Sequence, residues 1–214
     1  MVSELFITPP GRPAQTSPRT GVPYRNEMVA GLILLGLSSV LALVIGLRPG
    51  PNVLDHWGLS ELPLSVHSTF YLRILDLGGL PVLLGGSVLA ALVVMGRDRR
   101  RAIACVCGPI AAVVLVEWAI KPLVGRHYFG VLCFPSGSVT VVAAVSTSWV
   151  LAVPRWLRWP AIAAGVLLVS LISIAVVVVR WHYLSDALAG VMFAVGVVLS
   201  FDGIIHLTER RQTL

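Results

Sequence analysis

Three polar segments interrupt an otherwise apolar chain, and they carry the residue types of phosphate chemistry. The first covers residues 121–128 and contains Lys121 and Arg126. Arg binds a phosphate oxyanion with a planar fork of N–H groups, whereas Lys binds it as a point charge. We therefore expect Lys121 and Arg126 to bind a phosphate group. In the alternative interpretation, both side chains only extend to the membrane surface, and Glu117 forms a local ion pair with Lys121.

The second segment is Pro135-Ser136-Gly137, directly before an apolar run that begins at Ser138. A helix that starts here would present free backbone N–H groups and the positive end of its dipole to an anion. Glycine would let the backbone approach that anion closely. We expect the Ser136 hydroxyl and the Gly137 N–H to hold phosphate oxygens, although the segment could also be a simple helix cap.

The third segment opens the last apolar run and contains Arg180, His182 and Asp186. His182 and Asp186 are four residues apart, so in a helix they would share one face. A carboxylate bonded to one ring nitrogen fixes the tautomer and leaves the other nitrogen as a nucleophile or base. The pattern predicts a catalytic His182 oriented by Asp186, and the alternative is a purely structural pair.

These segments must be positioned by membrane helices. The chain has 214 residues, of which 57% are hydrophobic and only 12% charged, about half the charged fraction of a soluble domain. A membrane span needs about 20 mostly apolar residues. We predict an all-α, polytopic membrane protein with one domain over 28–206, a disordered cytoplasmic tail over 1–27 and a second tail over 207–214. The six predicted transmembrane helices are 28–47, 74–96, 102–120, 138–153, 160–179 and 183–205.

Basic residues between these runs predict the orientation. Eleven Lys and Arg residues lie on the side of the two termini and five on the other side. This excess places both termini in the cytoplasm and the loops 48–73, 121–137 and 180–182 outside. The three polar segments would then meet on the outward face. The short loops and the lack of organelle signals suit a bacterial inner membrane.

Other classes of function fit the sequence poorly. The net charge of +6 does not indicate nucleic-acid binding, because the arginines lie at the ends of apolar runs. The cysteines, Cys105, Cys107 and Cys133, have no second pair or nearby histidine at zinc-ligand spacing. We therefore expect packing cysteines, no metal site and no cofactor.

The polar segments resemble the motifs of the type 2 phosphatidic acid phosphatase family, membrane lipid phosphatases related to vanadium haloperoxidases. The best match is the stretch from His182 to Gly190, followed by Lys121 to Arg126. The resemblance covers residues 75–205 and implies a bundle of six transmembrane helices. It also implies that His182 attacks phosphorus to form a phosphohistidine, that Asp186 orients it, and that Lys121, Ser136 and Gly137 bind the phosphate without a metal.

Three positions depart from the family pattern. Tyr128 stands where the first motif has Arg, Ser138 where the second has the His that acts as general acid, and Val176 where the third has Arg. Losing a general acid typically costs about 10²–10⁴ in rate. Arg180, one helical turn after Val176, could replace the missing cation, and His127 or Tyr128 could act as an alternative acid.

We therefore expect an enzyme that hydrolyses the phosphate or diphosphate of an isoprenoid or glycerolipid, with that lipid phosphate and the surrounding membrane lipid as its partners. The alternative is a degenerate family member that binds lipid phosphate, or assists a partner enzyme, without turnover. A transporter ranks third, because no broken-helix pair of an inverted repeat is visible.

Overall fold

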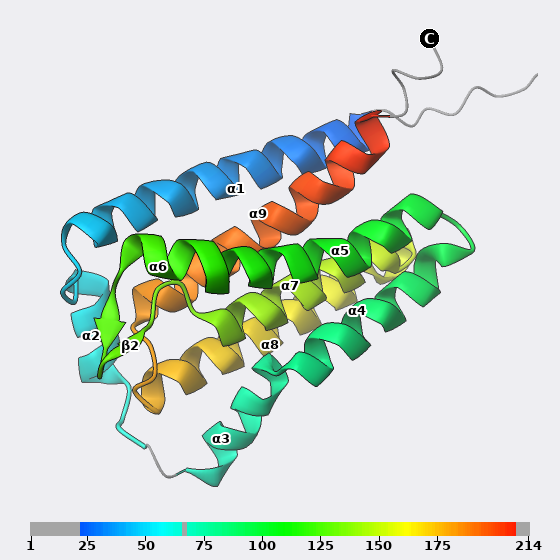
Figure 1. The fold of residues 1–214 in the computed structure, drawn as a ribbon. Coiled ribbons are helices and arrows are strands. Elements are labelled where there is room, and N and C mark those ends of the chain that lie inside the picture. Colours follow the sequence, from blue (N-terminus) through cyan, green and yellow to red (C-terminus); the bar gives the residue numbers. More distant parts are fainter. Residues whose placement is uncertain (1–21, 66–67, 209–214) are drawn as a thin grey trace, which may run out of the picture.

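The computed structural model describes residues 22–65 and 68–208, and its main feature is a bundle of long helices (Figure 1). Of the predicted tails over 1–27 and 207–214, residues 1–21 and 209–214 lie outside the described residues. The first helix begins at Val22, so residues 22–27 are helical where we expected a tail. The last helix ends at Thr208, two residues beyond the predicted domain boundary.

Four helices are long and apolar enough to cross a membrane, which makes this an integral membrane protein. The second of them is continuous from Arg99 to Val124, because α5 passes into the π-helix η2 and then into α6. Lys121 thus lies in a helix and not in the predicted loop. The helices are α1 (Val22–Leu47), α5 (Arg99–Leu115) with η2 (Val116–Ile120) and α6 (Lys121–Val124), α8 (Arg158–Val178), and α9 (Leu184–Thr208).

The predicted span over 74–96 is broken. Its helices, α3 (Thr69–Leu75) with η1 (Asp76–Gly78) and α4 (Leu80–Met95), meet at an angle of 51° and together form one bent candidate span. Gly79 lies at the break with an extended backbone, and Pro81 follows in the first turn of α4. Proline has no N–H to continue a helical ladder and is well tolerated in a first turn, so the chain restarts a new helix here.

The predicted span over 138–153 is the helix α7 (Gly137–Ala152), which has 16 residues. At 1.5 Å per residue it is about 24 Å long, shorter than a hydrocarbon core of about 30 Å. Six spans are therefore not confirmed, and the described residues contain four, or five with the bent pair. Beyond the end of α7, Trp156 in η3 (Arg155–Leu157) and Trp159 in α8 are exposed, as expected of side chains at a membrane surface.

The three polar segments lie at the same end of the bundle (Figure 1). This end carries the short helix α2 (Val53–Glu61), the hairpin of β1 (His127–Tyr128) and β2 (Val131–Leu132), α6, and the start of α9. The region 48–73, which we expected to be a loop, thus contains α2 and part of α3. The start of α1, the α4–α5 turn and the end of α9 lie at the opposite end.

Small residues let the helices approach closely around α7 and α9. A Cβ on Gly31 of α1 would lie 2.6 Å from the Ser200 hydroxyl of α9. A Cβ on Gly190 of α9 would lie 2.8 Å from the Ser136 carbonyl oxygen, just before α7. Gly190 therefore sets the depth at which the start of α7 rests on α9.

Gly190→Ala is expected to lower the melting temperature in detergent, because the added methyl group meets a backbone atom that cannot rotate away. Overpacking of this kind typically costs about 1–3 kcal/mol. The matched control is Gly85→Ala in α4, where a Cβ meets nothing within 4 Å. Equal melting temperatures for the two variants would contradict this account of the α7–α9 contact.

Candidate functional site

Arg126 is fully buried at the end of the bundle that carries the polar segments. Each of its five N–H groups has an acceptor within the protein, and its guanidinium also lies 4.2 Å from the centre of the Tyr183 ring. The acceptors are Pro49 O at 3.1 Å, Gly50 O at 3.1 Å, Asp55 Oδ2 at 2.6 Å, Ser185 Oγ at 2.8 Å and Asp186 Oδ1 at 2.5 Å. Arg126 thus joins the α1–α2 turn, α2 and the start of α9.

This arrangement corrects our expectation that Arg126 binds phosphate, because no N–H group is left for a ligand. Asp55 is also fully buried, and its second oxygen accepts the Ser185 N–H at 2.9 Å. Burial alone would raise the pKa of the Asp55 carboxyl, but hydrogen bonds from Arg126 and Ser185 outweigh it and hold the pKa below its ordinary value. The pair is therefore ionised and structural.

His182 lies just before α9 with its imidazole almost buried. Its Nδ1 is 2.7 Å from the carbonyl oxygen of Cys133. A carbonyl can only accept, so Nδ1 carries the proton, and in the neutral imidazole Nε2 keeps the lone pair. The ring is thus held in the tautomer that a nucleophile needs.

Asp186 does not form a hydrogen bond with the His182 imidazole. Its Oδ2 is 3.7 Å from Nδ1 of His182, and α9 begins only at Leu184, so the two residues do not share a helical face as expected. The carboxylate instead accepts the Tyr183 N–H at 2.9 Å, and the Asp186 carbonyl accepts the Ser136 N–H at 3.0 Å. Asp186 therefore fixes the backbone on both sides of the site.

Lys121 lies beside Gly137, the first residue of α7. Its Nζ donates to both carboxylate oxygens of Glu117, at 2.7 and 2.8 Å. Glu117 belongs to the π-helix η2, and π-helical turns inside α-helices are frequent at functional sites. An ideal Cβ on Gly137 would overlap the Glu117 carboxylate, at 2.1 Å from Oε1. The ion pair therefore rests directly on the first residue of α7.

The start of α7 offers unpaired donors. Ser136 is fully buried, and its Oγ has no hydrogen-bond partner among the described residues. The N–H groups of Gly137 and Ser138 belong to the first turn of the helix, where no intrahelical acceptor exists. These are the donors that the Pro-Ser-Gly segment was expected to offer, and their role in binding an anion stays a prediction.

Two cavities meet at Lys121 and His182. We call the first the α7 cavity; it has a volume of about 240 Å³, and its polar lining consists of Glu117, Lys121, Ser138 and His182. The second, the hairpin cavity, has a volume of about 530 Å³ and extends beneath the β-hairpin. Its lining residues are Lys121, Tyr128, Phe129, Val131, Leu132, Val179, Arg180, Trp181 and His182. A small polar space thus joins a larger, mostly apolar one.

Arg180 lines the hairpin cavity, while Val176 is buried in the apolar core between α7 and α8. The Arg180 Nη2 donates to the carbonyl oxygens of Leu59 and Leu62, whereas its buried Nη1 has no partner among the described residues. Arg180 also has a φ of +59°, a strained value for a non-glycine residue that is most often tolerated at functional sites. Arg180 therefore provides a cation one helical turn after Val176, which replaces the arginine of the family motif.

The two residues considered as alternative acids differ in position. His127 is exposed, and its Nδ1 pairs with the Gly125 carbonyl oxygen at 2.9 Å, within its own turn. Tyr128 lines the hairpin cavity with its ring against Tyr183, and burial raises the pKa of its phenol. The structure brings only Tyr128 to the site. Burial also raises the pKa of the Cys133 thiol to about 12, so that thiol is not a nucleophile.

Sequence reasoning missed three participants. Asp55 stood in a region taken for a loop, and the Cys133 carbonyl oxygen is a backbone atom with no sequence signal. Glu117 was considered only as a local partner of Lys121. The sign that could have identified Asp55 is that a buried arginine requires a buried carboxylate to balance its charge.

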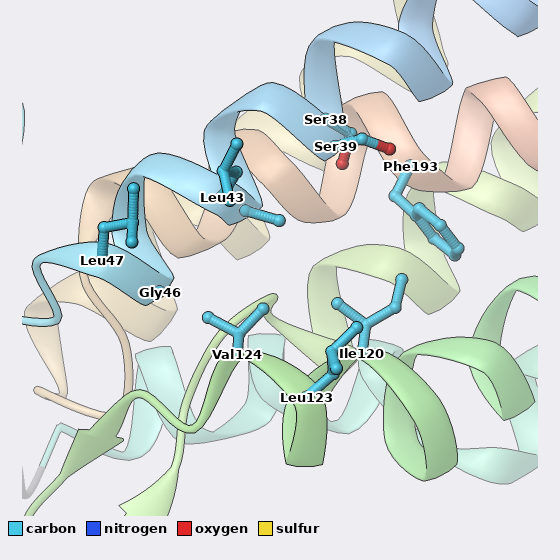
Figure 2. Close-up of a pocket in the computed structure, with 10 residues that line it drawn as sticks. Ser38, Ser39, Leu43, Gly46, Leu47, Ile120, Leu123, Val124 and Phe193 are labelled. Carbon is cyan, nitrogen blue, oxygen red and sulfur yellow. The ribbon is translucent and has the colours of Figure 1, made fainter.

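A groove between α1, α6 and α9 lies apart from this site (Figure 2). Its volume is about 470 Å³, and its lining is apolar except for Ser38 and Ser39. Figure 2 shows Ile120, Leu123 and Val124 facing α1 across the groove. None of its lining residues belongs to the candidate site.

No protein-family model and no curated protein sequence matches this chain. Its fold is that of a PAP2-type membrane phosphatase. The match is to the crystal structure of a transmembrane PAP2 type phosphatidylglycerolphosphate phosphatase from Bacillus subtilis, with a TM-score of 0.61. The two chains are 17% identical, and the match covers 86% of this chain and 98% of the other. The match confirms the expected PAP2-like fold, whereas the six expected spans are not confirmed.

Arg126→Met is expected to destabilise the protein by about 3–5 kcal/mol, because it leaves two buried carboxylates without their cation. Unfolding in detergent, followed by heat or denaturant, measures the change. Arg48→Met serves as the control, since Arg48 is exposed at the same end of the bundle and exposed substitutions usually change stability by less than about 0.5 kcal/mol. A loss no larger than that of the control would show that the Arg126 network is not structural.

Proposed function

We propose that this protein is a membrane lipid phosphatase that works through a phosphohistidine on His182. The observation that carries the proposal is the hydrogen bond from His182 Nδ1 to the Cys133 carbonyl oxygen. It leaves Nε2 unprotonated beside cavities that also contain Lys121. A fixed imidazole next to a cation and a helix N-terminus is suited to attack a phosphate group.

Binding would use the donors that the protein leaves open. The Ser136 hydroxyl and the N–H groups at the start of α7 would hold phosphate oxygens, together with Lys121. Arg180 Nη1 would contact the phosphate from the hairpin cavity. These groups would stabilise the negative charge that builds up in the transition state. Such electrostatic stabilisation is the largest contribution to the rate enhancement of many enzymes.

Turnover would proceed in two steps. Nε2 of His182 forms a bond to phosphorus while the bond from phosphorus to the lipid oxygen breaks. The positive charge on the imidazole then faces the Cys133 carbonyl oxygen and the Asp186 carboxylate, 3.7 Å from Nδ1. Water next attacks the phosphohistidine and releases inorganic phosphate.

The hairpin cavity suits the lipid part of the substrate. Phe129, Val131 and Trp181 line it and are exposed, and exposed aromatic side chains are typical of the membrane surface. We infer a phosphate or diphosphate of an isoprenoid or glycerolipid, bound from the outer leaflet of a bacterial inner membrane with both termini in the cytoplasm.

One observation favours a second function, the binding of lipid phosphate without turnover. The family histidine that protonates the leaving group is replaced by Ser138, a residue that cannot supply a proton as an imidazole does. Saturable binding of a lipid phosphate without phosphate release would support this alternative.

His182→Ala is expected to reduce phosphate release from lipid phosphates to the background rate, because it removes the only imidazole among the described residues that line the two cavities. The assay uses purified protein in detergent without added metal, with a panel of isoprenoid and glycerolipid phosphates. His56→Ala is the control, since His56 is exposed on α2 at the same end of the bundle. Undiminished release by the His182 variant would refute the proposal.

A further inference from the structure

The carboxylate of Glu117 occupies the α7 cavity, between the cation and the helix that the proposed function assigns to phosphate. It is 2.7 and 2.8 Å from the Lys121 ammonium, and its Oε1 lies against Gly137. Ser138 and His182 line the same cavity. An acidic side chain therefore lies where the phosphate and its leaving oxygen would come together.

Phosphoryl transfer to His182 needs such a group, because an alkoxide is a poor leaving group unless it is protonated as the bond breaks. Among the other groups at the site, the Ser138 hydroxyl is a very weak acid. Tyr128 lines only the hairpin cavity, and burial disfavours release of its proton. Glu117 is the one carboxyl group among the residues lining either cavity.

We propose, on the basis of the phosphatase function above, that Glu117 is the general acid and base of this site. It protonates the lipid oxygen as His182 attacks, and it then activates the water that hydrolyses the phosphohistidine. The role that a histidine at position 138 would perform from α7 is thus performed from the π-helix η2 on the opposite wall of the cavity.

The proton balance closes with groups already present. The substrate enters as a phosphate monoester monoanion, and its phosphate proton passes to the Glu117 carboxylate when Lys121 pairs with the phosphate. As the bond from Nε2 to phosphorus forms, the bond from phosphorus to the lipid oxygen breaks and Glu117 gives that oxygen its proton. In the second step Glu117 takes a proton from the attacking water, and the electron pair of the N–P bond returns to Nε2. Glu117 then gives that proton to the departing phosphate, which leaves as the monoanion H₂PO₄⁻ and restores the Glu117 carboxylate.

A simple ion pair on a helix surface does not account for this geometry. Ion pairs between residues four apart stabilise helices only slightly, and they do not require contact with a neighbouring helix. Here the carboxylate fills the space beside Gly137 that any side chain would take. Lys121 also keeps a third N–H donor for a phosphate oxygen, and the Glu117 side chain is partly exposed.

Glu117→Gln tests the assignment, because glutamine keeps the shape and the hydrogen bonding but has no acidic proton. Two probes share one lipid chain: farnesyl phosphate, which must expel an alcohol, and farnesyl diphosphate, which expels a phosphate group that needs little protonation. We expect kcat to fall about 10²–10⁴-fold for farnesyl phosphate and by less than about tenfold for farnesyl diphosphate. Glu61→Gln, an exposed carboxylate at the same end, serves as the matched control and is expected to match the wild type on both.

The remaining outcomes separate this assignment from the proposed function. Equal losses on the two probes would mean that Glu117 acts in binding or folding, and no loss on either would mean that it has no role; both overturn the assignment. Melting temperatures confirm that the variants are folded. If the wild-type protein turns over neither probe, the proposed function fails, and the assignment fails with it.

Discussion

The end of the bundle that carries the candidate site depends on one buried cation, the guanidinium of Arg126. Its N–H groups link the α1–α2 turn, α2 and the start of α9, and its ion pair with Asp186 connects it to the candidate site. A buried arginine is costly unless every donor finds an acceptor, so the elements that provide those acceptors are held in a single arrangement. The position of His182, four residues before Asp186, is a consequence of that arrangement. In the sequence Arg126 thus resembles a phosphate ligand. In the structure it holds together the elements that carry the candidate site.

The site itself is assembled from backbone atoms as much as from side chains. The Cys133 carbonyl oxygen orients the imidazole, and the Asp186 carbonyl oxygen accepts the Ser136 N–H before α7. Gly190 permits this contact by having no side chain. A rigid backbone frame allows a side chain to keep its orientation outside a helix, which explains how the His182 imidazole is held although His182 precedes α9.

The sequence could predict the helical membrane fold, because apolar runs and charge positions report directly on membrane insertion. It could also predict that Lys121, the Pro-Ser-Gly segment and His182 come together, and Lys121, Gly137 and His182 line one cavity. It could not predict the break at Gly79, where a Gly-Leu-Pro sequence inside an apolar run gives the same hydropathy as an unbroken helix. The role of Arg126 was also out of reach, since a cation that binds phosphate and one that binds Asp55 have the same side chain. The position of Glu117 against α7 was not predictable either. Its i,i+4 spacing to Lys121 suggests only a local pair, and the π-helical turn that brings it onto α7 has no simple sequence signature.

The shortness of α7 determines how deep the site lies. The exposed Trp156 and Trp159 mark the membrane surface just beyond its C-terminal end. A helix of about 24 Å that starts at that surface ends several ångströms short of the other surface of a core of about 30 Å. With a membrane surface at the level of these tryptophans and α7 parallel to the membrane normal, Gly137 would lie below the opposite lipid headgroups, where few mobile ions enter. The attraction between the α7 dipole and an anion at this depth is screened less by salt than it would be at an exposed helix end.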